Sequence, residues 1–124
     1  MARILIAEDE EPVRTLLARA LAEDGHSVVA TADGGEALDT LQKEGGAFDL
    51  LLADIKMPVM DGIALALAVA RDFPKLPILL MTGYADQRER VSGLEALICD
   101  VIAKPFALAE IKFAVASAVA KGKR

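Results

Sequence analysis

FDLLLADIKMPVMDG, residues 48–62, is the stretch that decides the fold of this 124-residue chain. Its first part, 48–53, is a short and mostly apolar run, the pattern of a strand buried on both faces of a sheet. Asp54 follows directly at the end of this predicted strand. A loop containing Pro58 then leads into a helix predicted over residues 63–72. The stretch therefore predicts a buried strand, an acidic residue at its end and a helix, in that order.

The same alternation of strand and helix extends in both directions from this stretch. Strands are predicted at residues 3–7, 27–31, 48–53, 78–82 and 98–103. Helices are predicted to begin near residues 12, 35, 63, 86 and 108, and the fourth of them covers 86–97. Because parallel strands between helices are typically continuous apolar runs, this alternation predicts an α/β fold. The expected architecture is a doubly wound, five-stranded parallel sheet with five helices.

The composition agrees with such a core and argues against several other classes. Of the residues, 54% are hydrophobic but only 4% are aromatic, so the core must consist of aliphatic side chains. The net charge of -5 argues against binding to nucleic acid, which needs a surplus of Lys and Arg. No apolar run reaches the roughly 18 residues of a membrane-spanning helix, and no signal peptide is visible. We therefore expect a cytoplasmic protein without a membrane partner.

The single cysteine and the single histidine exclude two kinds of site. Cys99 is the only cysteine, so no internal disulfide can form. It lies in the apolar run 97–103, which predicts a buried structural thiol. His26 is the only histidine and lies in a predicted turn, so a zinc site with several histidines is excluded.

Polar residues follow the predicted strands, at the edge of the sheet where ligands of open α/β folds bind. The carboxylates among them would repel one another unless a cation lay between them, and oxygen ligands favour Mg²⁺ over zinc. Glu8, Asp9 and Asp54 are therefore candidate ligands of Mg²⁺. The complete set is Glu8, Asp9 and Glu10 after the first strand, Asp54 after the third, Thr82 and Gly83 after the fourth, and Lys104 and Pro105 after the fifth.

The same set suits phosphoryl transfer, which depends on positioning and on the neutralisation of charge. Lys104 offers a cation, Thr82 offers a hydroxyl donor, and Asp54 can accept the phosphoryl group as an acyl phosphate. Each residue taken singly is also typical of a helix cap or a turn. The occurrence of the whole set at strand ends favours the functional interpretation.

Four motifs resemble the receiver domain of bacterial two-component response regulators. They are ILIAEDE at 4–10, DIKMPVMDG at 54–62, MTG at 81–83 and KPF at 104–106. The resemblance covers nearly the whole chain and implies the strand order 2-1-3-4-5 of CheY-like proteins. It also leads us to expect one receiver domain over residues 1–121, a basic tail over 122–124 and no output domain.

The resemblance assigns roles in metal binding and phosphorylation. Asp54 corresponds to the phosphorylated aspartate. Glu8 and Asp9 correspond to the acidic pair that holds Mg²⁺, together with Asp54 and the main-chain carbonyl of Lys56. Glu8 stands at a position where Asp is more common in this family. Because its side chain is longer by one methylene, we expect it to bind Mg²⁺ through a water molecule. Lys56 is a second departure from the family pattern. Its long cationic side chain, beside the acyl phosphate, would hinder or orient the attacking water.

The resemblance also assigns residues that sense the phosphoryl group. Thr82 corresponds to the hydroxyl residue that turns inward, and Lys104 to the lysine that pairs with the phosphoryl group. The peptide bond before Pro105 is expected to be cis. Position 101, where an aromatic switch residue is common in this family, is Val101. Tyr84 is then expected either to replace that aromatic residue and shield the phosphoryl group or merely to cover the loop.

The resemblance implies a protein switch that has no enzymatic activity beyond its own phosphorylation and dephosphorylation. A histidine kinase or a histidine phosphotransferase would be the donor, and a protein would be the target of a monomer or weak dimer. Residues 57–70 and 81–90 are similar to the CpdR group of cell-cycle receivers, which control proteolysis by the ClpXP protease. A phosphate shuttle or another CheY-like switch is the alternative. An aspartate-nucleophile phosphohydrolase is disfavoured, because that class needs a second acid where this chain has Lys56.

Overall fold

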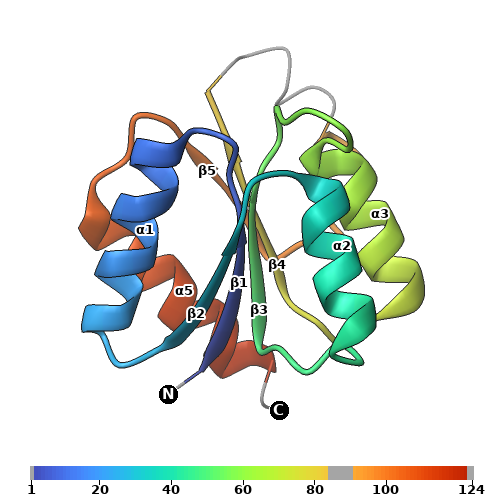
Figure 1. The fold of residues 1–124 in the computed structure, drawn as a ribbon, viewed down its shortest axis with the longest axis horizontal. Coiled ribbons are helices and arrows are strands. Elements are labelled where there is room, and N and C mark those ends of the chain that lie inside the picture. Colours follow the sequence, from blue (N-terminus) through green and yellow to red (C-terminus); the bar gives the residue numbers. More distant parts are fainter. Residues whose placement is uncertain (1, 84–90, 123–124) are drawn as a thin grey trace.

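Five parallel strands form one sheet between two layers of helices, as the computed structural model of residues 2–83 and 91–122 shows (Figure 1). The strands are β1 (Arg3–Ala7), β2 (Ser27–Thr31), β3 (Leu50–Asp54), β4 (Ile78–Thr82) and β5 (Asp100–Ala103). Their order in the sheet is β2-β1-β3-β4-β5, and every neighbouring pair is parallel. The predicted doubly wound sheet and its strand order are therefore confirmed.

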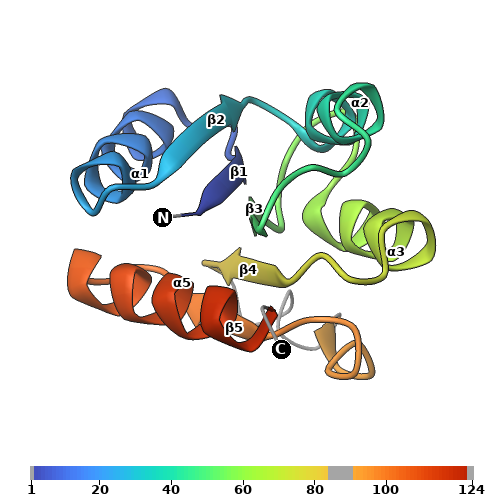
Figure 2. The same ribbon diagram turned by 90° about the horizontal axis from the view of Figure 1, so that it is seen from below.

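Helices cover both faces of the sheet, so the strands alternate between two cores (Figure 2). The helices of the described residues are α1 (Glu11–Glu23), α2 (Gly34–Lys43), α3 (Gly62–Asp72) and α5 (Leu108–Gly122). Ile4 and Ile6 of β1 pack into the core on the side of α1 and α5. Leu5 and Ala7, the intervening residues, pack into the core on the side of α2 and α3. This alternation explains why β1 is apolar throughout.

Local signals in the sequence account for where the helices start. Asp33 precedes α2 and its carboxylate accepts a hydrogen bond from the N–H of Glu36 at 2.7 Å. Asp61 precedes α3 and accepts in the same way from the N–H of Ala64 at 2.8 Å. Pro12 lies in the first turn of α1, as predicted. The loops at the carboxyl edge of the sheet are thus held where they enter their helices.

The predicted helix over 86–97 needs correction. Residues 84–90 lie outside the described part of the chain; Val91 is still helical, but residues 92–93 and 95–97 form turns. Gly93 has a φ of 95°, a left-handed conformation that ends a helix. The described residues therefore contain four of the five predicted helices. The strands β3 and β5 also begin later than predicted, at Leu50 and Asp100.

The prediction of a buried thiol at Cys99 is wrong, because this side chain is exposed. Cys99 immediately precedes β5, which is an edge strand of the sheet. An apolar run at a sheet edge is covered on fewer sides than the same run in the middle of the sheet. The apolar residues around Cys99 in the sequence therefore do not predict the burial of its side chain.

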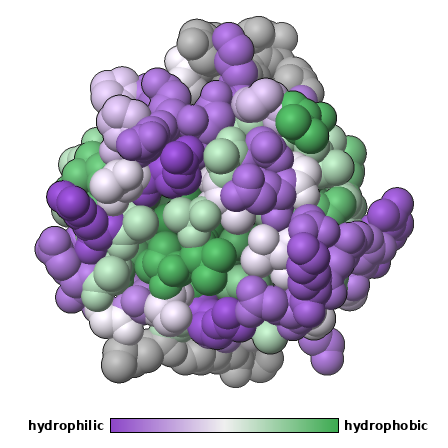
Figure 3. All heavy atoms as spheres, in the orientation of Figure 1, coloured by the Kyte–Doolittle hydropathy of each residue, from purple (hydrophilic) through white to green (hydrophobic). Residues whose placement is uncertain are grey.

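The opposite edge of the sheet is β2, which faces the viewer in Figure 1. Polar residues occupy most of this face, and apolar side chains gather near its middle (Figure 3). Among the described residues, no helix is both long and apolar enough to cross a membrane.

Candidate functional site

The candidate site lies at the carboxyl ends of four strands. Asp54 is the last residue of β3 and Thr82 the last residue of β4. Glu8 follows β1, and its N–H still donates to the carbonyl of Thr31 at 3.1 Å, which extends the strand by one residue. Lys104 follows β5 and its N–H donates to the carbonyl of Thr82 at 2.7 Å. Backbone pairing of the sheet thus positions each of these side chains.

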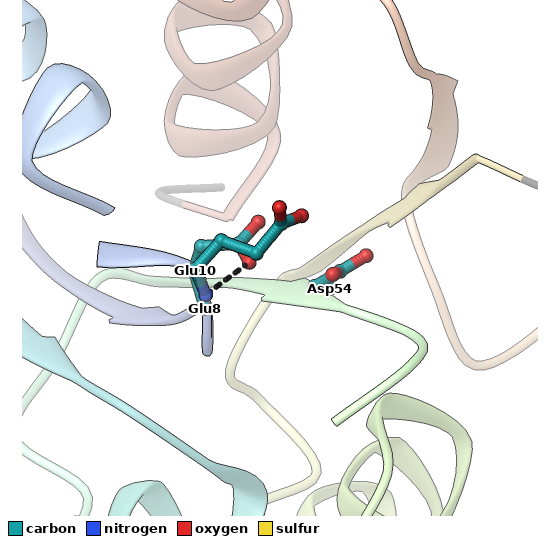
Figure 4. Close-up of side chains that lie close together, drawn as sticks. All are labelled: Glu8, Glu10 and Asp54. Carbon is teal, nitrogen blue, oxygen red and sulfur yellow. Dashed lines mark hydrogen bonds between the residues drawn. The ribbon is translucent and has the colours of Figure 1, made fainter. Parts of the chain in front are cut away.

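Lys104 is the centre of a buried ion network. Its Nζ donates to Oε1 of Glu8 at 2.8 Å and to Oδ2 of Asp54 at 3.1 Å. Oε1 of Glu10 lies farther away, at 3.9 Å. Only 19% of the Lys104 side chain is exposed, against 0% for Glu8 and 8% for Asp54. Oxygens of Glu8, Glu10 and Asp54 lie within 4.8 Å of one another (Figure 4).

Burial sets the electrostatics of this network. Desolvation raises the pKa of Glu8 above its ordinary value of 4.5, and the hydrogen bond from Lys104 opposes that rise. Desolvation likewise raises the pKa of Asp54 above 3.8, against the opposing charge of Lys104. Burial by itself would lower the pKa of Lys104, but the hydrogen bond to Glu8 and the charge of Asp54 raise it. The single ammonium therefore compensates two buried carboxylates only in part.

An open cavity of about 690 Å³ leads from the surface to Asp54. Its polar lining includes Asp9, Glu10, Lys56 and Lys104, besides Asp54 itself. With Glu8 behind them, four carboxylates face two ammonium groups, which leaves a net of two negative charges. Hard oxygen donors with an excess of negative charge are what Mg²⁺ requires, so the residues present fit this ion.

Apolar residues form the other wall of the cavity. Val13 and Leu16 come from α1, and Pro105 and Phe106 follow Lys104. The Lys104–Pro105 peptide bond is cis, as predicted. The site therefore has a charged floor and one apolar side, and it is open to the surface.

The loops around Asp54 are packed closely against it. Arg14 of α1 donates to the carbonyls of Glu8 and Asp9, at 3.0 and 3.4 Å. A Cβ at Gly62, the first residue of α3, would lie 2.3 Å from the carbonyl oxygen of Asp54. Only a glycine permits this approach. Helix α1 thus holds the loop after β1, and α3 packs closely against the backbone of Asp54.

Most predicted site residues are brought together by the fold. Glu8, Asp54 and Lys104 are in direct contact, Asp9 and Lys56 line the cavity, and Thr82 is buried at the end of β4. Tyr84 lies outside the described residues. Glu10, which was expected at this edge of the sheet but was not among the candidate metal ligands, joins the acidic cluster. Its position in the acidic run after β1 was the available signal.

The chain matches the response regulator receiver domain over residues 4–116. It belongs to this family. Receiver domains are signalling domains of two-component systems, so the predicted family is confirmed. The narrower similarity to the CpdR group is not confirmed.

Known proteins similar to this receiver agree with the assignment. It is 37% identical to the transcriptional regulatory protein TcrA of Mycobacterium tuberculosis over 109 residues, which are 88% of this chain and 42% of TcrA. The chain thus spans less than half the length of that relative. A receiver domain protein from Clostridium thermocellum has the same fold, with a TM-score of 0.91, 21% identity and coverage of 99% and 98% of the two chains.

A further solved structure is closer in sequence. The response regulator protein TrrA from Thermotoga maritima, in complex with Mg(2+)-BeF, has a TM-score of 0.83 and 31% identity to this receiver. The likeness covers 94% of this chain and 98% of TrrA.

Proposed function

We propose that this receiver is a switch that is phosphorylated on Asp54 in the presence of Mg²⁺. The observation that carries the proposal is the position of Asp54, which lies at the floor of an open cavity with Nζ of Lys104 only 3.1 Å from Oδ2. A nucleophilic carboxylate beside a cation suits phosphoryl transfer, because charge on the transferred group must be neutralised. The complex of TrrA with Mg(2+)-BeF supports the same chemistry by similarity.

The transfer itself is one displacement at phosphorus. An oxygen of Asp54 attacks, a P–O bond to the carboxylate forms, and the bond between phosphorus and the donor breaks. The electron pair of that bond leaves with the donor, which is the imidazole of a phosphohistidine or the acetate of acetyl phosphate. Lys104 would pair with a phosphoryl oxygen, and the hydroxyl of Thr82 would donate to another.

Asp9, Asp54 and the main-chain carbonyl of Lys56 would hold Mg²⁺, together with Glu8 in the set that the family resemblance implies. When bound, the ion would neutralise charge on the phosphoryl oxygens. Asp9 and Lys56 line the same cavity as Asp54, which supports this arrangement. Glu10 also lines the cavity and adds to its negative charge.

The output is proposed to be binding to a protein partner, after a histidine kinase or histidine phosphotransferase has supplied the phosphoryl group. The net charge of -5 supports a protein target over nucleic acid. Control of ClpXP-dependent proteolysis in the cell cycle is a narrower hypothesis, which rests on the similarity of residues 57–70 and 81–90 to the CpdR group. A phosphate shuttle would use the same site. Lys56, two residues after Asp54, disfavours a phosphohydrolase.

Labelling with acetyl phosphate and MgCl₂ tests the function. Intact-mass spectrometry should show one added phosphoryl group on the wild type and none on Asp54→Asn. Asp61→Asn is a matched control, since Asp61 caps α3 and its side chain accepts from Ala64. Unchanged labelling of Asp54→Asn would refute the assignment of the acceptor. A pulldown with wild type and Asp54→Asn would then show whether ClpXP is a partner of one form.

A further inference from the structure

The loop after β1 begins a run of four acidic residues, EDEE at 8–11. Like charges at this spacing repel one another, so the loop needs to be held in place. Lys104 approaches the loop from the carboxylate side, with Nζ 2.8 Å from Oε1 of Glu8 and 3.9 Å from Oε1 of Glu10. A different cation, Arg14 of α1, approaches the same loop from its main-chain side.

Arg14 binds three successive main-chain carbonyls of this loop. Its Nη1 donates to the carbonyl oxygen of Glu8 at 3.0 Å and to that of Asp9 at 3.4 Å. Its own N–H donates to the carbonyl oxygen of Glu10 at 2.9 Å. The side chain of Glu10, the N-cap residue of α1, makes no capping hydrogen bond. One residue of α1 therefore holds the backbone of the whole loop.

A cation that binds carbonyls leaves the carboxylates of the loop available. Asp9 and Glu10 line the cavity that leads to Asp54, whereas Arg14 is not among the residues that line it. Burial, and secondarily the charge of Asp9, raise the pKa of Asp54. The carboxylate of Asp9 therefore acts on Asp54 across this cavity, while the guanidinium of Arg14 stays on the other side of the loop.

We propose that Arg14 is a positioning residue for the metal site, which holds the main chain of residues 8–10 so that the carboxylate of Asp9 faces the cavity beside Asp54. The inference rests on the proposed function, because Mg²⁺ is the ion that these two carboxylates would share. Arg14 acts through the backbone and is neither a ligand of the ion nor a contact of the phosphoryl group.

The charge of Arg14 and its hydrogen bonds act on Mg²⁺ binding with opposite signs. A positive charge near the site repels a divalent cation, so removal of the charge by itself tightens binding. Hydrogen bonds that hold a ligand in place reduce the ordering that binding requires, so their removal weakens binding. The direction of the change in affinity therefore distinguishes a positioning residue from a simple charge.

An NMR titration of ¹⁵N-labelled protein with MgCl₂ measures this direction. We expect Arg14→Met to raise the Kd for Mg²⁺ by about tenfold, the usual effect of losing a residue that orients metal ligands. Arg19→Met is the matched control, because it removes the same charge from an exposed position of the same helix. It should change the Kd by less than about twofold. Unchanged or tighter binding in Arg14→Met would overturn the proposal, as would equal effects of the two variants.

The order of the loop is measured in the same samples without metal. ¹⁵N relaxation should show larger motions of the amides of Asp9 and Glu10 in Arg14→Met, while the amides of β1 stay as in the wild type. Unchanged relaxation of the loop would overturn the proposal. If Arg14→Met does not fold, Arg14→Lys takes its place, because it keeps the charge but loses the planar fork of donors. It should raise the Kd by about threefold, and wild-type affinity in this variant would overturn the proposal.

Labelling by acetyl phosphate separates this inference from the proposed function. At MgCl₂ concentrations below the Kd, Arg14→Met should be labelled more slowly than the wild type, and saturating MgCl₂ should restore the rate to within about twofold. A defect that persists at saturation would overturn the proposal, because Arg14 would then act on more than metal affinity. Failure of the proposed function would appear in the wild type itself, as the absence of Mg²⁺-dependent labelling.

Discussion

Two ion pairs of this receiver have the same length and different consequences. Nζ of Lys104 lies 2.8 Å from Glu8, and Nε of Arg71 lies 2.8 Å from Asp72. The first pair is nearly buried, with 19% and 0% of the side chains exposed, while 75% of the Arg71 side chain is exposed. The hydrogen bond from Arg71 lowers the pKa of Asp72, whereas desolvation raises that of Glu8. Burial, and not distance, therefore decides what a carboxylate can do here.

Among the changes that test this comparison, removal of the buried cation should have the largest effect on stability. Lys104→Met leaves the carboxylates of Glu8 and Asp54 buried without a compensating cation, so we expect the free energy of unfolding to fall by about 3 kcal/mol at neutral pH. Urea denaturation measures the change. Mg²⁺ should restore part of the loss in the variant, because it supplies positive charge to the same carboxylates. A loss below about 1 kcal/mol would show that solvent already screens the network.

The backbone beside Asp54 gives the next largest expected effect. Gly62→Ala places a methyl group 2.3 Å from the carbonyl oxygen of Asp54, and neither backbone can give way easily. We expect a loss of about 2 kcal/mol of stability, and slower labelling of Asp54. Gly35→Ala is the control, since its methyl group would meet the exposed side chain of Val59 at 3.0 Å. Equal stabilities of the two variants would contradict the close packing around the acceptor.

A smaller effect is expected from neutralising Asp54, and it depends on pH. The pKa of Asp54 is raised on folding, so the folded state binds this proton more tightly than the unfolded state. The folded protein thus loses stability as the pH rises through the raised pKa. Asp54→Asn removes that loss and should be more stable than the wild type at pH 7. The difference should vanish as the pH falls below the ordinary value of 3.8. Denaturation at several pH values measures it, and a constant difference would refute this account.

The smallest effect should come from the exposed pair. Asp72→Asn removes the partner of Arg71 at the end of α3, and we expect no measurable change in stability or in labelling of Asp54. Thermal denaturation at low and high salt is a sensitive check. A clear loss of stability would show that this exposed pair matters as much as the buried one and would break the comparison.

Several features were predictable because they depend on short stretches of chain. The parallel strands, the Pro12 start of α1 and the location of Asp54 at a strand end follow from apolar runs and their boundaries. The assignments of Asp54 and Lys104 to one site followed from the strand ends of an α/β sheet. Predictions failed where an element's surroundings matter more than its composition. Cys99 lies in an apolar run but at the edge of the sheet, and a left-handed Gly93 follows soon after the helical Val91, so the predicted helix does not reach residue 97.

By itself, the sequence determined the order of strands and helices and the residues that the strands deliver to their carboxyl ends, because periodicity and apolar runs are local properties. Only the tertiary structure decided how the acidic residues after β1 divide. Glu8 is buried against Lys104, while Asp9 and Glu10 face the cavity. That division depends on β5 bringing Lys104 across from a position 96 residues away in the chain. What Asp54 can do therefore depends on which charged side chains are buried beside it.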